Sequence, residues 1–213
     1  MADFQLYCFA QSGNAYKAAL MLKLCGADWE PLFVDFFGGE TRGERYRSMV
    51  NEMGEVPVLV DGDLKLSQTG VILPYLADKF GRFLPESGAD RREAARWILF
   101  DNHKFTSYLA TYRFFHAFAK STDPAVMDFF RGRIRGTLGI IDKHLARQPF
   151  VVGESPSIAD LSMCGYLFFP PEEFGFDIAA ENPAIAAWLD RIKALPGWVH
   201  PYQLMPGHPR PAA

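Results

Sequence analysis

Ser12 and Asn14 could do chemistry, because they stand in a polar turn between an apolar run and a segment of strong helix formers. A serine hydroxyl attacks a substrate only when a neighbouring base takes its proton, and the residues around Ser12 supply no base. A serine directly before a helix can also cap that helix by accepting a backbone N–H, which needs no base. The residues alone therefore favour a capping role for Ser12.

Gln68 and Thr69 stand where a predicted strand turns into a predicted helix. The first N–H groups of a helix have no partner within the helix, and its dipole favours an anion at that end. A carboxylate can bind at such a place without any special device. Thr69 can equally be a helix cap and nothing more, and the residues alone leave both interpretations open.

Pro57 opens a predicted strand, and because proline has no N–H it is confined to strand starts and edges. A trans Val56–Pro57 bond would make it a stiff entry to the strand. A cis bond, which only about 5–6% of X-Pro bonds in folded proteins adopt, would turn the N–H and C=O of Val56 away from the sheet. Both groups could then pair with an extended peptide, as in strand addition.

Several other candidate groups have simpler explanations. Cys8, Cys25 and Cys164 lie far apart and are odd in number, so they indicate neither a disulfide framework nor a zinc site. No Cys-x-x-Cys pair is present, and the five histidines lack metal-ligand spacing. Ser157 and Asp160 have the spacing of a capping box, which predicts a role in folding. The sequence therefore predicts no metal site.

The secondary structure that must position these residues is of two kinds. The sequence pattern changes from one kind to the other near residue 85. Before it, strand and helix patterns alternate, which predicts a mixed four-stranded sheet covered by helices. The predicted strands are 4–9, 30–34, 56–60 and 64–66, and the predicted helices are 15–24, 41–50 and 69–80. In this order of elements, a proline at position 57 matches the cis-proline of the thioredoxin-like fold.

Beyond residue 85 almost all of the chain is typical of helix. The predicted helices are 91–120, 123–147, 157–169 and 182–195, followed by a proline-rich, irregular tail over 196–213. We therefore predict an N-terminal thioredoxin-like domain over 1–82, a linker over 83–90 and an all-helical C-terminal domain over 91–213.

Composition and charge exclude several classes of protein. Of the 213 residues, 49% are apolar and 22% charged, which is typical of soluble globular proteins. The net charge of −3 argues against a nucleic-acid binder, which would carry a basic face. No apolar run reaches the roughly 18 residues of a membrane span, and the first residues lack the features of a signal peptide. We therefore expect a cytoplasmic protein with no membrane or nucleic-acid partner.

Segments spread over most of the chain resemble the cytosolic glutathione transferase family, in the expected order. Residues 51–59 (NEMGEVPVL) resemble its N-x-x-G-x-V-P-x-L segment, and residues 67–76 (SQTGVILPYL) its [EQ]-[ST]-x-x-I-x-x-Y-L signature. Residues 157–160 resemble its capping box, and residues 183–196 its last core helix. The turn at 12–17 (SGNAYK) is similar to a bacterial branch with S-G-N-x-Y-K there. Together these matches are specific.

The resemblance implies a glutathione S-transferase, which activates the glutathione thiol as a thiolate for attack on a hydrophobic electrophile. Glutathione would be a consumed cosubstrate, with no cofactor and no metal. The γ-glutamyl end would be held at Gln68 and Thr69, and the peptide backbone at Val56 and Pro57. The resemblance further implies a homodimer that serves detoxification, with the active site in a cleft between the two domains.

In this interpretation the Ser12 hydroxyl donates a hydrogen bond to the sulfur of glutathione, and Asn14 helps through its amide N–H. A charge-assisted bond of this kind contributes about 1.5–3 kcal/mol, which is about one to two pKa units. Tyr7 is a rival donor, because some classes of the family use a tyrosine on the first strand. Cys8 lies four residues too early to match the classes that use cysteine.

Aromatic residues at helical spacing, Phe105, Tyr108 and Tyr112, follow in the second half of the chain. A stripe of this kind is usually core or a dimer face. The resemblance implies that the same helix also lines the pocket for the electrophile.

Two residues depart from the family pattern. Glu52 replaces the proline common after Asn51, and Glu55 replaces the Lys or Arg frequent before Val-Pro. A carboxylate at position 55 could repel the glycine end of glutathione. The basic residues that could compensate are Arg42, Arg45 and Arg47.

Two alternatives stand beside the transferase. One is another glutathione-dependent enzyme, such as an isomerase, a peroxidase or a dehalogenase. The other is a non-catalytic, transferase-like binding module.

Overall fold

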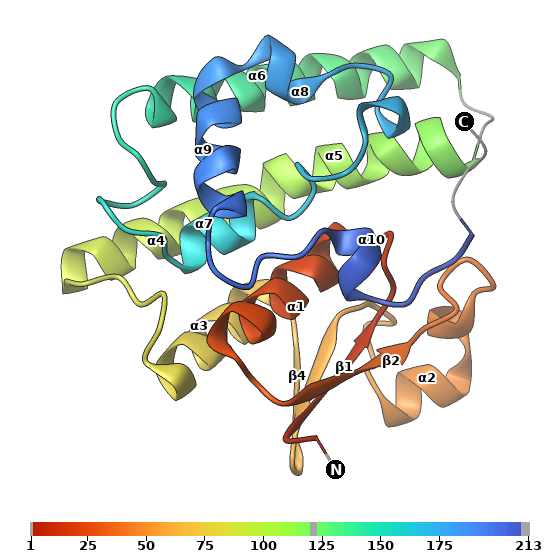
Figure 1. Cartoon of the computed structure of the whole chain (residues 1–213). Coiled ribbons are helices and arrows are strands. Elements are labelled where there is room, and N and C mark those ends of the chain that lie inside the picture. Colours follow the sequence, from red (N-terminus) through yellow and green to blue (C-terminus); the bar gives the residue numbers. More distant parts are fainter. Residues whose placement is uncertain (1, 120–122, 210–213) are drawn as a thin grey trace. The chain divides into compact units, whose positions relative to one another are not determined.

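A computed structural model of the chain describes residues 2–119 and 123–209, which form two compact units (Figure 1). The first unit holds residues 2–84 together with Leu195–Pro209, and the second holds Pro85–Ala194. The last residue of the helix predicted over 91–120 and the last four residues of the predicted tail lie outside the described residues.

The first unit contains a mixed four-stranded sheet with the strand order β2-β1-β3-β4. Strand β1 runs parallel to β2 and antiparallel to β3, and β3 runs antiparallel to β4. The elements in chain order are β1 (Phe4–Cys8), α1 (Gly13–Cys25), β2 (Trp29–Phe33), α2 (Glu44–Met49), β3 (Val58–Asp61), β4 (Leu64–Ser67) and α3 (Thr69–Phe80). This order confirms the predicted thioredoxin-like fold.

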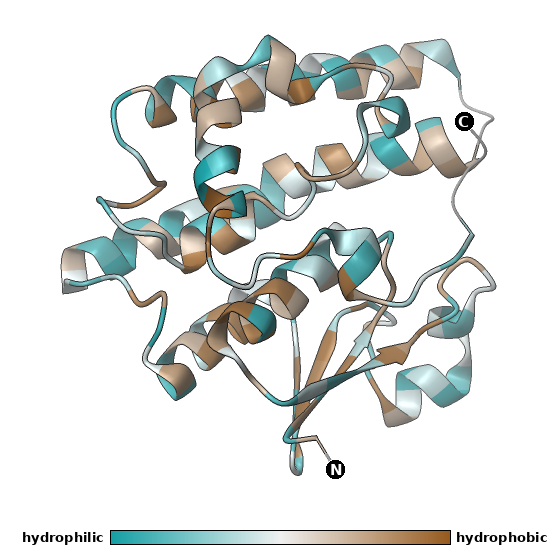
Figure 2. Cartoon of the chain, in the orientation of Figure 1, coloured by the Kyte–Doolittle hydropathy of each residue, from teal (hydrophilic) through white to brown (hydrophobic). Residues whose placement is uncertain are grey.

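Different helices cover the two faces of the sheet. The ring of Phe4 packs on Phe80 of α3 with the centroids 5.7 Å apart, whereas Tyr7 meets Tyr46 of α2 edge-on at 6.3 Å. Because alternate residues of a strand point to opposite faces, α3 covers the Phe4 face and α2 covers the Tyr7 face. Helix α1 packs beside α3. The strands are largely hydrophobic in Figure 2, whereas α2 carries many hydrophilic residues, as expected for a helix with a solvent-exposed side.

The second unit is entirely helical in the part of the chain that the structure describes, which confirms the predicted all-helical domain. Two π-helical segments flank α5 (Thr106–Arg113): Asp101–Phe105 joins it to α4, and Phe114–Ala119 continues it at its other end. The α-helices are α4 (Gly88–Phe100), α5 (Thr106–Arg113), α6 (Pro124–Leu145), α7 (Ile158–Met163), α8 (Ile178–Glu181) and α9 (Pro183–Lys193). Within this unit α5 packs on α6, α6 on α9, and α4 on α7.

Several helix ends differ from the sequence prediction, and two of the differences have a clear cause. Helix α4 begins before residue 91, because Ser87 and Asp90 form a capping box that starts the helix inside the predicted linker. Helix α7 ends at Met163, whereas the prediction continued the helix to residue 169. Residues 161–169 are all buried, so their hydrophobic pattern has no polar side that would mark where the helix stops.

The segment Leu195–Pro209, expected with the helical domain, packs in the first unit. It forms the short helix α10 (Pro201–Leu204), which lies against α1. The Tyr16 hydroxyl of α1 donates a hydrogen bond to the Val199 carbonyl oxygen at 2.9 Å. These contacts join residues that are more than 180 positions apart, so no local pattern in the sequence indicates them.

Candidate functional site

The register of the sheet brings three chain segments to one edge. Strand β1 ends at Cys8, β3 begins at Val58, and β4 ends at Ser67. In the pairing Tyr7 lies opposite Val58, and Val58 lies opposite Ser67. The residues that follow β1, precede β3 and follow β4 therefore leave the sheet at the same edge. These are the turn with Ser12, the Val56–Pro57 pair, and Gln68 with Thr69.

Ser12 is the N-cap of α1, and its hydroxyl oxygen accepts the Ala15 N–H at 3.1 Å. The side chain is buried, with 5% of the residue exposed. Among the residues that the structure describes, none accepts a hydrogen bond from the Ser12 hydroxyl. The hydroxyl proton is therefore available to a ligand, at a helix end where the dipole already favours negative charge. Capping and donation to an anion are compatible at this residue.

Asn14 lies within the first turn of α1 and is half-buried. Its Oδ1 is buried and has no hydrogen-bond partner among the described residues. Buried amide oxygens are usually paired. The side-chain oxygen of Asn14 thus makes no hydrogen bond that holds the turn together.

Tyr7 points away from the helix that Ser12 caps. Its ring packs edge-on against Tyr46 of α2, whereas the neighbouring strand residues Phe4 and Cys8 face α3. The geometry agrees with the packing role considered for Tyr7 from the sequence.

Cys8 is the last residue of β1 and has no exposed surface. Burial raises the pKa of the Cys8 thiol to about 12, because a thiolate loses its hydration in the interior. The thiol therefore stays protonated at neutral pH, which makes it a poor nucleophile.

We expect iodoacetamide to leave Cys8 unmodified in the folded protein at neutral pH. Mass spectrometry of the digested protein measures the modification. Treatment in concentrated urea is the control, because unfolding exposes Cys8 and should allow its alkylation. Rapid alkylation of Cys8 in the folded protein, with parallel loss of activity, would show that this cysteine takes part in the chemistry.

The Val56–Pro57 peptide bond is cis, and Val56 is half-buried. Among the described residues none makes a hydrogen bond to the backbone N–H or C=O of Val56. The preceding carbonyl, that of Glu55, is occupied, since it accepts bonds from the Tyr46 hydroxyl at 3.0 Å and the Asn51 amide at 3.1 Å. The loop is thus fixed through Glu55 while the peptide groups of Val56 stay unpaired at the edge.

The backbone at Gly54 explains why the segment 51–59, which contains Pro57, has a glycine at this position. Its φ is +68°, and an added Cβ would lie 2.7 Å from the Thr41 carbonyl oxygen. Only glycine combines this backbone conformation with so close an approach.

Gln68 precedes α3 with a φ of +68°, a region that residues other than glycine rarely adopt. Such conformations are held in place by their surroundings and cluster at functional sites. Its side-chain amide donates to the Glu55 carboxylate at 2.6 Å. Thr69 is the first residue of α3 and is buried. The contact between Gln68 and Glu55, both outside regular elements, has no signal in the sequence pattern.

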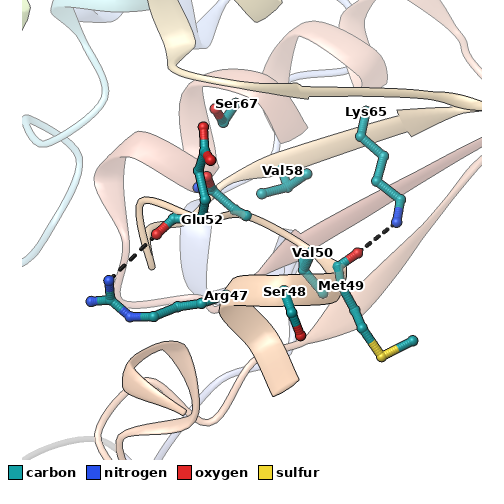
Figure 3. A pocket seen from close by; sticks show the side chains of 9 residues that line it. Arg47, Ser48, Met49, Val50, Glu52, Val58, Lys65 and Ser67 are labelled. Carbon is teal, nitrogen blue, oxygen red and sulfur yellow. Dashed lines mark hydrogen bonds between the residues drawn. The ribbon is translucent and has the colours of Figure 1, made fainter. Parts of the chain in front are cut away.

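A pocket of about 580 Å³ lies beside this edge, on the face of the sheet that α2 covers (Figure 3). Its lining comes from α2, the loop after it, β3 and β4: Arg47, Ser48, Met49, Val50, Asn51, Glu52, Val58, Lys65 and Ser67. The Lys65 ammonium donates to the Met49 carbonyl oxygen at 2.7 Å, as Figure 3 shows. The pocket carries two cationic side chains, Arg47 and Lys65, and one carboxylate, that of Glu52, so its lining has a net positive charge.

Of the three arginines that could offset Glu55, Arg47 lines this pocket, and its guanidinium donates to the Glu52 carbonyl oxygen at 3.4 Å. All three arginines are exposed, and Arg42 and Arg45 do not line the pocket.

The aromatic residues expected at the electrophile pocket lie in the second unit. Phe105 and Tyr112 are buried, with 1% and 0% exposed. The Tyr112 hydroxyl accepts a bond from the Arg131 guanidinium at 3.0 Å. Tyr108 is half-buried, and its ring lies 6.4 Å from that of Phe130. Tyr108 is thus the member of the stripe with ring surface left for a ligand.

Among the described residues, no three His, Cys, Asp or Glu side chains cluster as a metal site would require. In the same part of the chain, no helix has the length and apolar character needed to cross a membrane.

Comparison with known proteins gives a consistent result for both units. Residues 2–78 match the family model for the glutathione S-transferase N-terminal domain, and residues 124–191 match that for the C-terminal domain. Glutathione S-transferase F14 of Arabidopsis thaliana is 31% identical over 217 residues, which cover 93% of this chain and 83% of that protein.

A bacterial relative and a solved structure are similar to this chain over most of its length. The disulfide-bond oxidoreductase YfcG of Escherichia coli (strain K12) is 28% identical over 196 residues, covering 88% of this chain and 89% of that protein. The crystal structure of a glutathione S-transferase from Pseudomonas fluorescens superposes with a TM-score of 0.86 at 32% identity, covering 94% of this chain and all of the other.

Proposed function

Because this chain belongs to the glutathione S-transferase family, we propose that it is a glutathione transferase whose Ser12 hydroxyl activates the thiol. The observation that carries the proposal is the register of the sheet, which brings Ser12, Val56 and Gln68 to one edge. Two of these present unused groups: the hydroxyl proton of Ser12 and the backbone N–H and C=O of Val56.

Glutathione is an extended tripeptide with a carboxylate at each end and a thiol in the middle. In the proposed complex the γ-glutamyl end lies at Gln68 and Thr69, where the N-terminus of α3 favours a carboxylate. The cysteinyl backbone pairs with Val56 next to the cis bond to Pro57, in the manner of an added strand. This places the thiol toward Ser12 at the start of α1.

The reaction begins with loss of the thiol proton to solvent. The Ser12 O–H donates to the resulting thiolate, Asn14 adds its amide N–H, and the N-terminus of α1 adds positive potential. The sulfur then forms a bond to an electrophilic carbon, and the leaving group departs with its electron pair. Thiolate formation and the holding of two reactants together supply the rate increase.

Further features of the proposal rest on the resemblance. These are a homodimer, a detoxifying role, membership of the bacterial Ser-Gly-Asn branch, and an electrophile held against the aromatic stripe of Phe105, Tyr108 and Tyr112. Within that stripe the partly exposed ring of Tyr108 is the best contact for an apolar substrate.

Turnover of an activated aryl halide with glutathione tests the proposal, because the product forms only if glutathione sulfur attacks carbon. We expect saturable turnover in both substrates. A second candidate is disulfide reduction, which the similarity to YfcG favours. It predicts turnover of a glutathione mixed disulfide and none of the halide. Binding of glutathione without either reaction would point to a binding module and contradict the transferase.

Glu55 provides a further prediction. Its exposed carboxylate lies beside the proposed peptide edge, so it repels the glycine carboxylate of glutathione. We expect Glu55→Gln to lower the Kd for glutathione about three- to fivefold at low ionic strength, the size of a surface charge interaction. The substituted amide keeps an oxygen that can accept from Gln68.

Calorimetric titration at low and high salt measures this change, and added salt should shrink it. Glu44→Gln, at an exposed position on α2, is the matched control and should leave the Kd unchanged. Weaker binding by Glu55→Gln would instead mean that the carboxylate matters through its hold on Gln68.

A further inference from the structure

The segment after α10 lies along the turn that carries Ser12. The Ala10 N–H donates to the Pro206 carbonyl oxygen at 2.7 Å. The Gln11 side chain makes two bonds to the backbone of His208: its Nε2 donates to the carbonyl oxygen at 2.7 Å, and its Oε1 accepts the N–H at 3.1 Å. Three hydrogen bonds thus tie the two residues before Ser12 to residues almost 200 positions away. We call Pro206–His208 the C-terminal clamp.

The central residue of the clamp, Gly207, lies so close to the turn that no side chain fits there. A Cβ added to Gly207 would lie 2.6 Å from the Ala10 Cβ and 2.8 Å from the Gln11 Oε1. Contacts below 3.0 Å are not tolerated, and one of the atoms involved is fixed to the backbone of Ala10. Glycine at position 207 is therefore a requirement of this contact.

The ring of His208 anchors the clamp. It packs against three phenylalanines of the first unit, Phe37 at 4.4 Å, Phe33 at 5.2 Å and Phe9 at 5.8 Å between ring centroids. Aromatic contacts of this kind stabilise a packed segment beyond the burial of its apolar surface. The segment is thus held by packing as well as by hydrogen bonds.

The clamp holds the backbone immediately before Ser12. Gln11, which makes two of its hydrogen bonds, is 3% exposed and directly precedes Ser12 in the chain. The Ser12 N–H donates to the Phe9 carbonyl oxygen at 3.0 Å, which closes the turn on its other side. A hydroxyl that must meet a sulfur atom needs a fixed backbone, because a small displacement costs a large factor in rate.

We propose that the C-terminal clamp positions Ser12 for thiol activation, with Gln11 and Gly207 as positioning residues that do not touch glutathione. The inference rests on the proposed function. It gives the chain's C-terminal segment a role in setting the pKa of the bound thiol, beyond its contribution to packing.

The test compares Gln11→Ala, Gln11→Glu and Gly207→Ala with the wild-type chain. For each, calorimetry gives the Kd of glutathione, ultraviolet thiolate absorbance gives the pKa of the bound thiol, and turnover of an aryl halide gives kcat and KM. We expect about tenfold lower kcat and a thiol pKa raised by up to one unit for Gln11→Ala and Gly207→Ala, in line with the cost of misplacing a reacting group. Measured at a pH below the pKa of the bound thiol, the Kd should change less than twofold, since the binding groups at Val56 and Gln68 are untouched. Gln11→Glu keeps the acceptor for the His208 N–H but sets a second oxygen against the His208 carbonyl oxygen, so it should lose at least as much as Gln11→Ala.

Gln203→Ala is the control, because Gln203 lies on α10 in the same segment and is exposed. It should match the wild type. If the clamp has a purely structural role, the Gln11 and Gly207 variants should lose thermal stability while the pKa of the bound thiol stays unchanged. That result would overturn the proposed positioning role. Ser12→Ala, measured in parallel, separates the two claims. If Ser12→Ala raises the pKa of the bound thiol and the Gln11 and Gly207 variants do not, the proposed role of the clamp is wrong. If Ser12→Ala has no effect, the proposed thiol activation is wrong.

Discussion

Replacing Ser12 with alanine is expected to raise the pKa of bound glutathione by about one to two units, the size of a lost charge-assisted hydrogen bond. Turnover at neutral pH should fall about ten- to a hundredfold, because less of the bound glutathione is thiolate. The effect should shrink at high pH, where the thiol ionises without help. A pH series of kcat together with the thiolate absorbance measures both quantities.

The same substitution also removes a helix cap, since the Ser12 oxygen accepts the Ala15 N–H. Loss of a cap lowers the free energy of unfolding by about 1 kcal/mol. Ser87→Ala is the matched control, because Ser87 is the N-cap of α4 and accepts the Asp90 N–H at 3.1 Å. It should show a similar loss of stability with unchanged turnover.

Ser12→Thr keeps a hydroxyl and should restore much of the activity. An alanine variant whose bound thiol titrates as in the wild type would remove Ser12 from the mechanism.

The largest loss of stability is expected from Asp160→Ala. The predicted capping box of Ser157 and Asp160 is confirmed, and Asp160 is completely buried. Beyond the box, its carboxylate also accepts the Val151 N–H and the Trp188 indole N–H, each at 2.8 Å. Alanine leaves these buried donors without a partner, and each unpaired buried donor costs about 1–3 kcal/mol.

We therefore expect the free energy of unfolding to fall by about 3–5 kcal/mol, a large part of the 5–15 kcal/mol typical of a folded protein. Urea unfolding followed by circular dichroism measures this quantity. Ser157→Ala removes the cap alone and should cost about 1 kcal/mol. Asp190→Ala, at an exposed position on α9, should cost almost nothing. A loss below 1 kcal/mol for Asp160→Ala would show that the carboxylate does not organise the second unit.

Much of the fold was predictable because its signals are local. The apolar run before residue 10 and the alanine- and leucine-rich segment after Ser12 gave β1 and α1 within one to two residues. The end of α7 was not predictable from the hydrophobic pattern, since residues 164–169 are as buried as those of the helix itself. The place of Leu195–Pro209 in the first unit depends on contacts with α1 and its preceding turn, which no window of the sequence contains.

The candidate site was predictable to the same extent. The resemblance to the glutathione transferase motifs named Ser12, Pro57 and Gln68, whereas the residues alone favoured a helix cap at Ser12 and left the role of Gln68 open. Their common edge required the structure, because it depends on the pairing of β1 with β3 and of β3 with β4. The structure was also needed to find the bond between Gln68 and Glu55, and the contacts of Gln11 with the C-terminal segment.

A crystal structure of the full chain with glutathione tests the central claim most directly. We expect the tripeptide to lie along the sheet edge with its backbone paired to Val56 and its γ-glutamyl carboxylate at the start of α3. Its sulfur should lie within hydrogen-bond distance of the Ser12 hydroxyl. Glutathione bound elsewhere, or at this edge with its sulfur turned away from Ser12, would contradict the account.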